Sequence, residues 1–312
     1  MSRYAFLGPA GTFTEMALVD WAPAVGAEHV PYETVPGCLA AVRSGAVDAA
    51  VVPIENSVEG GVTATLDTLA NGSPLHLIGE RLVPITFVLA VRPGTTLEDI
   101  TAVGTHSHAW AQVRGFAEER MPRAAYVPTL STASAAVALG ESEQAFQAAV
   151  CAPIAAQQNG LSVLAQDIGD IRHAVTRFAV VAQPGHLPAP TGADKSTVVL
   201  YQRTDHAGGL LELLEQFATR GINMTRLESR PTKDSMGSYC FSIDLEGHVA
   251  DERVADALVG LKRICADVVY LGSYARADQQ AATIAPRASD ADYGAARQWL
   301  DGIRATGSPV DN

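Results

Sequence analysis

The stretch from residue 47 to residue 62 constrains the fold more than any other part of the chain. An apolar, largely β-branched run over residues 49–54 stops abruptly at Glu55, Asn56 and Ser57. An unbroken apolar run is typical of a buried strand in a parallel sheet whose two faces are covered by helices. The sequence therefore predicts an α/β fold in which this strand ends in a crevice at the carboxyl edge of the sheet, where ligands of open α/β folds bind.

The residues that follow the run suit a ligand site. Asn56 and Ser57 have short hydrogen-bonding side chains, while Gly60 and Gly61 allow the backbone to approach a ligand closely, with amides able to face an anion. The alternative is an ordinary strand-to-helix junction capped by Asn or Ser. This stretch alone leaves both interpretations open.

Composition and charge narrow the classes of function. The chain has 312 residues, enough for two domains, and its hydrophobic content of 47% supports well-buried cores. The formal net charge is −12 and only three residues are lysines, so neither nucleic acid nor an anionic membrane is expected as a partner. An anionic substrate would have to be attracted locally, by one or two arginines and by helix amino termini.

The spacing of the cysteines and the sequence of the amino terminus indicate where in the cell the protein is expected. The four cysteines lie far apart without a Cys-x-x-Cys pair, which argues against a zinc site and a disulfide framework. The amino terminus lacks the apolar segment of a signal peptide, and no apolar run reaches transmembrane length. We therefore expect a cytoplasmic protein with buried, reduced thiols.

Up to about residue 183, short apolar strands alternate with Ala-rich helical segments. This alternation predicts βαβ units and a mainly parallel sheet. Because the block is too long for one small sheet, we expect two lobes around a cleft, with residues 78–165 forming the second lobe. Strands are expected at residues 4–7, 47–54, 85–91, 102–104, 147–152 and 178–181, and helices at residues 36–44 and 133–140.

The pattern changes after residue 183. Residues 183–194 contain three prolines and two glycines, which predicts a linker at 184–194. Over residues 195–275, the order strand, helix, strand, strand, helix, strand predicts a ferredoxin-like βαββαβ domain. The last segment, residues 276–312, is predicted to be a polar, Ala-rich tail with one helix.

Two polar turns follow strands of the first block. The first contains Gly8, Pro9, Gly11 and Thr12 and opens a helix, whose amides could meet a carboxylate or phosphate. A capping box between Thr12 and Glu15 is the alternative, and both can hold at once.

The second turn runs from Thr105 to Gln112. His106 and His108 would suit a metal site, but no carboxylate or thiol has suitable spacing. We favour a helix-opening loop in which Gln112 turns into the cleft.

Thr176, Arg177 and Phe178 lead into the last strand of the block. Thr176 offers a neutral hydroxyl, and Arg177 could clamp a carboxylate with two hydrogen bonds, although alone these residues fit better an ordinary strand start with a surface arginine. The sequence has no nucleophile elbow, zinc motif, P-loop or dinucleotide fingerprint, so neither a metal nor a cofactor is expected. What remains is a cleft of hydroxyls, amides, glycines and one arginine, which would act by positioning and hydrogen bonding.

In their order along the chain, these motifs closely resemble the prephenate dehydratases, which convert prephenate to phenylpyruvate. The likeness covers residues 3–275, and residues 208–210 and 222–231 resemble the ACT regulatory module of that family. It implies a two-lobed α/β catalytic domain at residues 1–183, like type II periplasmic binding proteins, followed by an ACT domain at residues 195–275. The family often has His-Pro-Gln where this chain has His106-Ser107-His108.

The resemblance also implies roles for individual residues. The ring hydroxyl of prephenate leaves together with carbon dioxide, and Thr176 would donate a proton or hydrogen bond to that hydroxyl. Arg177 and nearby backbone amides would hold the two carboxylates. The implied catalytic residues are Thr176, Arg177, Asn56, Ser57 and Gln112. The implied substrate-binding residues are Gly8, Pro9, Gly11, Thr12, Glu55, Gly60, Gly61, Thr105 and Phe178.

Feedback regulation follows from the same resemblance. L-Phenylalanine would bind the ACT domains of a homodimer or homotetramer at the interface between subunits. The implied effector-binding residues are Gly208, Gly209, Leu210, Asn223, Met224, Glu228, Ser229, Arg230 and Pro231. Because no chorismate mutase domain precedes Tyr4, we expect a monofunctional enzyme. Arogenate dehydratase and a non-catalytic amino-acid-binding regulator are the alternative functions.

Overall fold

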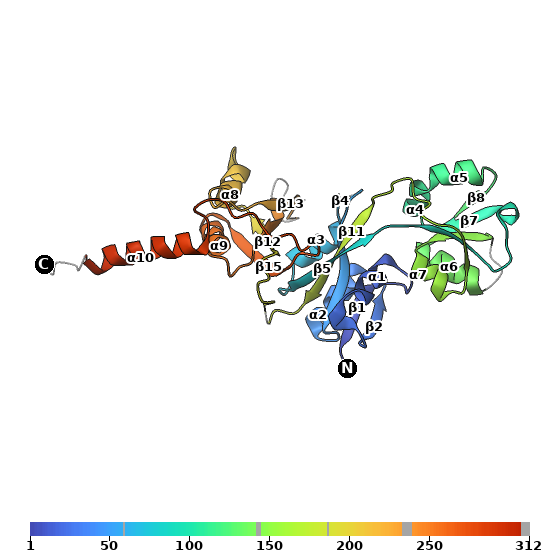
Figure 1. Ribbon diagram of the computed structural model, residues 1–312, viewed down its shortest axis with the longest axis horizontal. Helices are drawn as coiled ribbons and strands as arrows, with labels where there is room; N and C mark the ends of the chain where they lie inside the picture. Colours follow the sequence, from blue (N-terminus) through green and yellow to red (C-terminus); the bar gives the residue numbers. More distant parts are fainter. Residues whose placement is uncertain (59, 142–144, 186, 233–238, 307–312) are drawn as a thin grey trace. The chain divides into compact units, whose positions relative to one another are not determined.

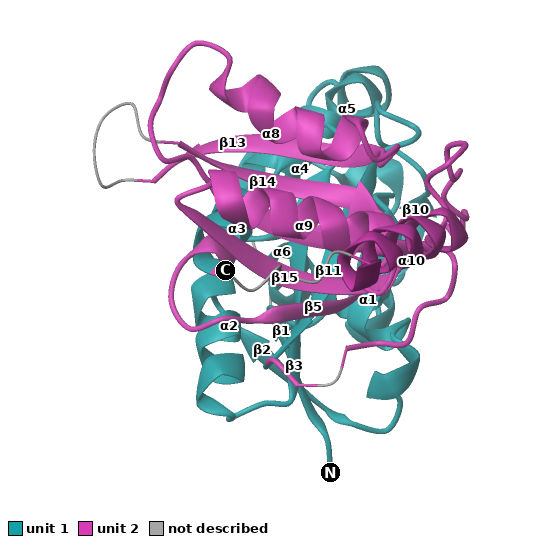
Figure 2. Cartoon of the chain, turned by 90° about the vertical axis from the view of Figure 1, so that its left-hand side faces the viewer, with its two compact units in different colours: residues 1–68, 81–183 teal, residues 69–80, 184–312 magenta. Residues whose placement is uncertain are grey.

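The chain forms two compact units, and each unit combines segments that are separate in the sequence. The computed structural model describes residues 1–312 except 59, 142–144, 186, 233–238 and 307–312, so the end of the expected tail lies outside the described residues (Figure 1). Unit 1 contains residues 1–68 and 81–183, and unit 2 contains residues 69–80 and 184–312 (Figure 2). The sequence did not predict that residues 69–80 would pack with the carboxyl-terminal unit.

The first lobe of unit 1 is built on a six-stranded sheet, one strand of which (residues 76–84) has its first five residues in unit 2. Its strands follow the order β2-β1-β3-β11-β5, and β4 pairs with β3. β1 runs parallel to β2 and β3, whereas β11 returns antiparallel to β3. The strands are β1 (Arg3–Leu7), β2 (Glu28–Tyr32), β3 (Ala49–Asn56), β4 (Gly60–Gly61), β5 (His76–Pro84) and β11 (Val175–Ala182). The helices are α1 (Phe13–Val19), α2 (Val35–Ser44) and α3 (Thr63–Ala70), with a 3-10 turn at Ala22–Ala24.

The second lobe of unit 1 has a five-stranded sheet of order β10-β6-β9-β7-β8. Its central strands are fully buried, and the Ala-rich helix α6 presents small side chains to this core. The strands are β6 (Val88–Val91), β7 (Ala102–Thr105), β8 (Ala125–Pro128), β9 (Ala148–Cys151) and β10 (Ser162–Ala165). The helices are α4 (Ser107–Gln112), α5 (Arg114–Arg120), α6 (Thr132–Glu141) and α7 (Pro153–Gln158), with a 3-10 turn at Leu97–Asp99.

Unit 2 has a four-stranded antiparallel sheet of order β13-β14-β12-β15. Helices α8 and α9 cover one face of the sheet (Figure 2), and a core that includes Leu200, Phe217, Ile243 and Leu261 fills the space between the helices and the sheet. The elements are β12 (Asp194–Tyr201), α8 (Gly209–Ala218), β13 (Met224–Pro231), β14 (Tyr239–Glu246), α9 (Glu252–Ile264), β15 (Asp267–Ala275) and α10 (Asp290–Thr306).

These elements confirm the predicted fold class: two α/β lobes followed by βαββαβ order. The sheets of unit 1 are nevertheless more mixed than the expected mainly parallel sheet, because each lobe contains antiparallel pairs. Five strands were not expected from the sequence: β2, β5, β8 and β10, which lie at sheet edges, and the two-residue β4. No helix in the described part of the chain is both long enough and apolar enough to cross a membrane.

Candidate active site

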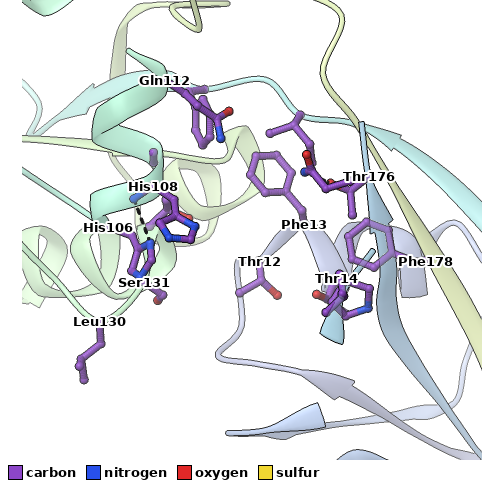
Figure 3. A pocket seen from close by; sticks show the side chains of 17 residues that line it. Thr12, Phe13, Thr14, His106, His108, Gln112, Leu130, Ser131, Thr176 and Phe178 are labelled. Carbon is purple, nitrogen blue, oxygen red and sulfur yellow. Dashed lines mark hydrogen bonds between the residues drawn. The ribbon is translucent and has the colours of Figure 1, made fainter. Parts of the chain in front are cut away.

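A pocket of about 350 Å³ lies in unit 1, where the carboxyl end of β3 meets the starts of α1, α4 and α6 and the strand β11 (Figure 3). Its lining combines apolar side chains with hydroxyls, amides and imidazoles. The residues are Thr12, Phe13, Thr14, Pro53, Asn56, Val62, Ile85, Phe87, His106, His108, Ala109, Gln112, Leu130, Ser131, Thr132, Thr176 and Phe178. The buried apolar strand thus ends at a pocket, as its sequence indicated.

Asn56 and Thr176 form the polar centre of one wall. The register of β3 and β11 sets them opposite each other, and the Asn56 side-chain amide donates a 2.8 Å hydrogen bond to the Thr176 hydroxyl oxygen. The orientation of the Asn56 amide is fixed because its carbonyl oxygen accepts from the backbone amide of Val58 at 2.8 Å. Since the Thr176 oxygen accepts from Asn56, its hydroxyl proton is directed elsewhere and can be donated to a ligand.

Arg177 and Glu55 are the next pair in the same register, and they face the other way. Successive side chains of a strand alternate between the two faces of a sheet, so residues adjacent to Thr176 and Asn56 point away from the pocket. The Arg177 guanidinium lies 3.2 Å from the Glu55 carboxylate, and its side chain is only 6% exposed. Neither Arg177 nor Glu55 is among the described residues that line the pocket.

Ser57 joins the ends of the same two strands. Its backbone amide donates to the carbonyl oxygen of Val175, and its hydroxyl accepts from the amide of Val175, both at 2.9 Å. Gly60 and Gly61 form the short strand β4, which pairs with the last residues of β3, and Gly60 has a φ of +82° that an L side chain rarely adopts. These three residues shape the end of β3 beside the pocket.

The turn before α1 is held mainly by contacts within the protein. The Thr12 hydroxyl caps the helix by accepting from the amide of Glu15 at 3.3 Å, while the Glu15 carboxylate accepts from the amide of Gly11 at 2.5 Å. The amide of Gly8 donates to the carbonyl oxygen of Tyr32 at 2.9 Å. Thr12 lines the main pocket, whereas Gly8 and Pro9 line a second pocket of about 600 Å³.

Two of the expected residues in the second lobe have different environments. Gln112, at the end of α4, lines the pocket. Thr105 is fully buried, and its hydroxyl donates a 2.7 Å hydrogen bond to the carbonyl oxygen of Val150, which joins β7 to the neighbouring strand β9.

Apart from Phe178, the apolar side chains at the floor of the pocket were not expected from the sequence. The rings of Phe13 and Phe87 meet edge to face, with centroids 5.7 Å apart and an interplanar angle of 82°. Phe13 adjoins Thr12 and could have been expected there, but nothing in the sequence marks Phe87 or Ile85, which come from a different lobe. Serine and threonine at 131 and 132 were missed for the same reason.

The expected effector-binding residues all lie in unit 2. Gly208 caps α8 with a φ of +88°, and Leu210 packs against the core beneath that helix. Met224 begins the edge strand β13, along which residues 228–231 follow. The two segments are therefore the start of a helix and an edge strand, and the latter is a position where a second subunit can add its own strand.

Comparison with known proteins identifies the family. Residues 4–186 match the prephenate dehydratase family and residues 197–263 match the ACT domain. The chain belongs to the prephenate dehydratase family. A prephenate dehydratase from Amycolatopsis methanolica is 49% identical over 305 residues, which cover 97% of this chain and 98% of the relative. A prephenate dehydratase from Mycobacterium marinum (strain ATCC BAA-535 / M) is 43% identical and covers 88% of this chain, with 89% of its own length matched.

Solved structures with the same fold include the following two. A prephenate dehydratase from Arthrobacter aurescens in complex with L-Phe is 56% identical, with a TM-score of 0.92 and coverage of 97% of this chain and 99% of that chain. A structure described as GqqA, a quorum quenching acylase, is 31% identical, with a TM-score of 0.80 and coverage of 89% of this chain and 100% of that chain.

Proposed function

We propose that this protein is a prephenate dehydratase, a carbon–oxygen lyase that converts prephenate to phenylpyruvate, water and carbon dioxide in L-phenylalanine biosynthesis. The observation that carries the proposal is the Asn56–Thr176 hydrogen bond of 2.8 Å at the wall of a pocket within the family-matched region. It supplies a neutral, oriented hydroxyl where the reaction needs a donor.

The reaction requires the ring hydroxyl and the ring carboxylate to leave together, and aromatisation of the ring drives it. Thr176 donates a hydrogen bond to the departing hydroxyl. Threonine is a weak acid, so this bond acts by tightening as negative charge develops on the leaving oxygen. The amide of Asn56, which donates to the Thr176 oxygen, polarises that hydroxyl and strengthens its donation.

The apolar floor fits the six-membered ring of the substrate. Phe13, Phe87 and Phe178 line the pocket beside Thr176, so a ring packed on them presents its hydroxyl to a defined donor. Such positioning lowers the entropic part of the barrier. Arg177 and Glu55 support this wall from its other face through their ion pair.

The test of this function is direct. The purified full-length protein is incubated with prephenate while phenylpyruvate absorbance is followed, and arogenate is assayed in parallel. Faster turnover of prephenate supports the proposal, whereas faster turnover of arogenate indicates arogenate dehydratase. If neither substrate is converted, the alternative of a non-catalytic amino-acid-binding regulator gains support.

We further propose that L-phenylalanine inhibits the enzyme by binding to unit 2. The structure of the Arthrobacter relative, which is 56% identical, is described as a complex with L-Phe. The effector lies between residues 208–210 of one subunit and residues 223–231 of another, so the protein is a homodimer or homotetramer. Light scattering on the eluted protein measures the assembly, and calorimetry measures binding of L-phenylalanine.

The regulatory proposal has a thermodynamic consequence that can be measured. If L-phenylalanine weakens prephenate binding by some factor, prephenate must weaken L-phenylalanine binding by the same factor. Ser229→Glu changes an exposed side chain of β13 and should weaken L-phenylalanine binding while leaving kcat near that of the wild type. Unaltered inhibition in this variant would place the effector elsewhere.

A further inference from the structure

The ionisable side chains of the main pocket are concentrated at the start of α4. Of the 17 residues that line the pocket, His106 and His108 are the only ones with titratable side chains. Figure 3 shows both imidazoles on the side of the pocket opposite Thr12, Thr14 and Thr176. A site for a dianionic substrate is therefore lined by neutral hydrogen-bonding groups on one wall and by two imidazoles on the other.

The chemistry of the substrate places its charges at the imidazole wall. In prephenate, the departing hydroxyl is on the ring carbon opposite the one that bears both the ring carboxylate and the pyruvyl side chain. If the hydroxyl meets Thr176, both carboxylates extend toward the far wall. The guanidinium of Arg177 is on the other face of the sheet, where it contacts Glu55 at 3.2 Å. It therefore does not contact a substrate carboxylate at the imidazole wall.

The contact between the two histidines distinguishes their roles. The Nδ1 atom of His106 accepts a hydrogen bond from the backbone amide of His108 at 3.3 Å, so neutral His106 carries its proton on Nε2. Protonation of His106 on Nδ1 would break this bond. The two rings meet edge to face with centroids 5.1 Å apart, and two positive charges at this separation would repel each other.

We propose that His108, as an imidazolium, binds one carboxylate of the substrate and acts as a positioning residue for the dehydration, while His106 remains neutral and orients the first turn of α4. The inference rests on the proposed function.

The charged side chains near α4 make contacts within the protein and do not line the pocket. On the adjacent helix α5, Arg114 pairs with Glu118 at 3.1 Å. The Asp170 carboxylate, in the segment between β10 and β11, accepts from the amide of Gly115 at 2.9 Å. The other elements that line the pocket contribute uncharged side chains, so the charge of the described lining changes only through the histidines.

The pH dependence follows from the sign of the linkage. Histidine side chains generally change charge between about pH 5 and 8. Because a bound carboxylate favours the imidazolium, the enzyme–substrate complex holds more protons than the free enzyme. Prephenate should therefore bind most tightly at the acid end of this range, and KM should rise as the pH increases.

The experiment compares His108→Gln with wild type and with His173→Gln, a matched control that replaces an exposed histidine outside the main pocket. kcat and KM for prephenate are measured across the range in which histidine titrates. At the acid end, KM of His108→Gln should be up to about 5-fold above that of the wild type, the scale of one exposed ion pair, and kcat should change little. Its KM should also lose most of its pH dependence, while His173→Gln should follow the wild type.

Two outcomes would overturn the inference. One is a KM for His108→Gln that rises with pH as steeply as that of the wild type. The other is loss of the pH dependence in His106→Gln but not in His108→Gln, which would show that His106 and not His108 carries the charge. Both outcomes are distinct from failure of the proposed function. That failure would be seen if the wild-type protein formed no phenylpyruvate from prephenate.

Discussion

The two units of this protein bury polar groups in opposite ways. In unit 1, the polar groups at the pocket are hydroxyls, amides and imidazoles that face a cavity. In unit 2, the buried polar groups include charged side chains that are paired with one another, such as Arg226 with Asp244 and Lys195 with Glu80. The difference separates a pocket whose polar groups face a cavity from a sheet whose buried charges fix its own structure.

The network around Asp244 illustrates the second case. Arg226 on β13 makes two hydrogen bonds to this carboxylate, at 2.9 and 3.0 Å. Thr197 on β12 donates to the same carboxylate at 2.8 Å, and its oxygen lies 2.8 Å from the hydroxyl of Tyr274 on β15. The contacts cross all four strands of the sheet. Charges that are removed from water in this way require such pairing, because an unpaired buried charge is strongly destabilising.

A second ion pair attaches residues 69–80 to the carboxyl-terminal sheet. The ammonium group of Lys195 lies 3.1 and 3.2 Å from the two carboxylate oxygens of Glu80. Nearby, Arg276 contacts both Glu246 and Asp278 and lowers the pKa of the Asp278 carboxyl to about 2. Unit 2 thus uses charge for cohesion between segments that are far apart in the sequence.

The largest expected effect comes from breaking the Asp244 network. Asp244→Asn keeps the shape of the side chain but leaves the buried guanidinium of Arg226 without its counterion. The free energy of unfolding of unit 2 should fall by about 3–5 kcal/mol, measured by chemical denaturation of the full chain. The control, Asp301→Asn, alters an exposed pair on α10 with an N–O distance of 3.5 Å and should change stability by at most about 0.5 kcal/mol. Equal effects of the two variants would contradict the comparison.

Removing a polar group from the pocket wall should instead lower turnover without affecting folding. Thr176→Ala removes the hydroxyl that Asn56 orients, and kcat should fall by about 10²–10³-fold, the usual loss for one preorganised donor. Thr176→Ser retains the hydroxyl and should retain more activity. Steady-state kinetics and thermal unfolding are measured on the same preparations. A kcat near that of the wild type in Thr176→Ala would refute the assignment of this residue.

Substitutions of Arg177 and Glu55 test whether this charged pair of unit 1 has a structural role, like the charged pairs of unit 2. If the guanidinium braces the wall through Glu55, then Arg177→Lys and Glu55→Gln should each lower kcat/KM, and their effects should not add. Lysine cannot replace the planar fork of arginine. A double-mutant cycle should give a coupling energy between about 0.5 and 3 kcal/mol, as for residues in contact. Additive effects would instead favour a direct contact between Arg177 and the substrate.

The sequence predicted the centre of the pocket better than its surroundings. The apolar run of β3 and the polar residues after it located the crevice, and the motif resemblance brought Asn56 and Thr176 into one site. The orientation of Arg177 depends on strand register, which composition does not specify. The register shift in the pairing of β3 with β11 leaves Ile54 of β3 as the extra residue, so Pro53 and Asn56 can both line the pocket. Thr176 and Phe178 share a face by normal alternation.

Most of the structural features that could not be predicted from the sequence depend on long-range packing. Edge strands such as β2 and β10 are partly exposed, so they lack the apolar run that marked β3. The membership of residues 69–80 in unit 2 depends on partners more than 100 positions away, including the Lys195–Glu80 pair with a separation of 115 residues. No local pattern reports such a contact.

The smallest expected effect concerns Ser57, which lies beside the pocket but is directed into the strand pairing. Ser57→Ala removes the hydroxyl that accepts from the amide of Val175 at 2.9 Å, while the hydrogen bond from the backbone amide of residue 57 to the carbonyl oxygen of Val175 remains. The site is exposed, so water can replace the lost acceptor, and the free energy of unfolding should fall by no more than about 1 kcal/mol. Because Asn56 and Thr176 stay paired, kcat should change far less than in Thr176→Ala. A fall in kcat as large as that of Thr176→Ala, with unchanged stability, would mean that Ser57 contacts the substrate directly and that the polar wall extends beyond the Asn56–Thr176 pair.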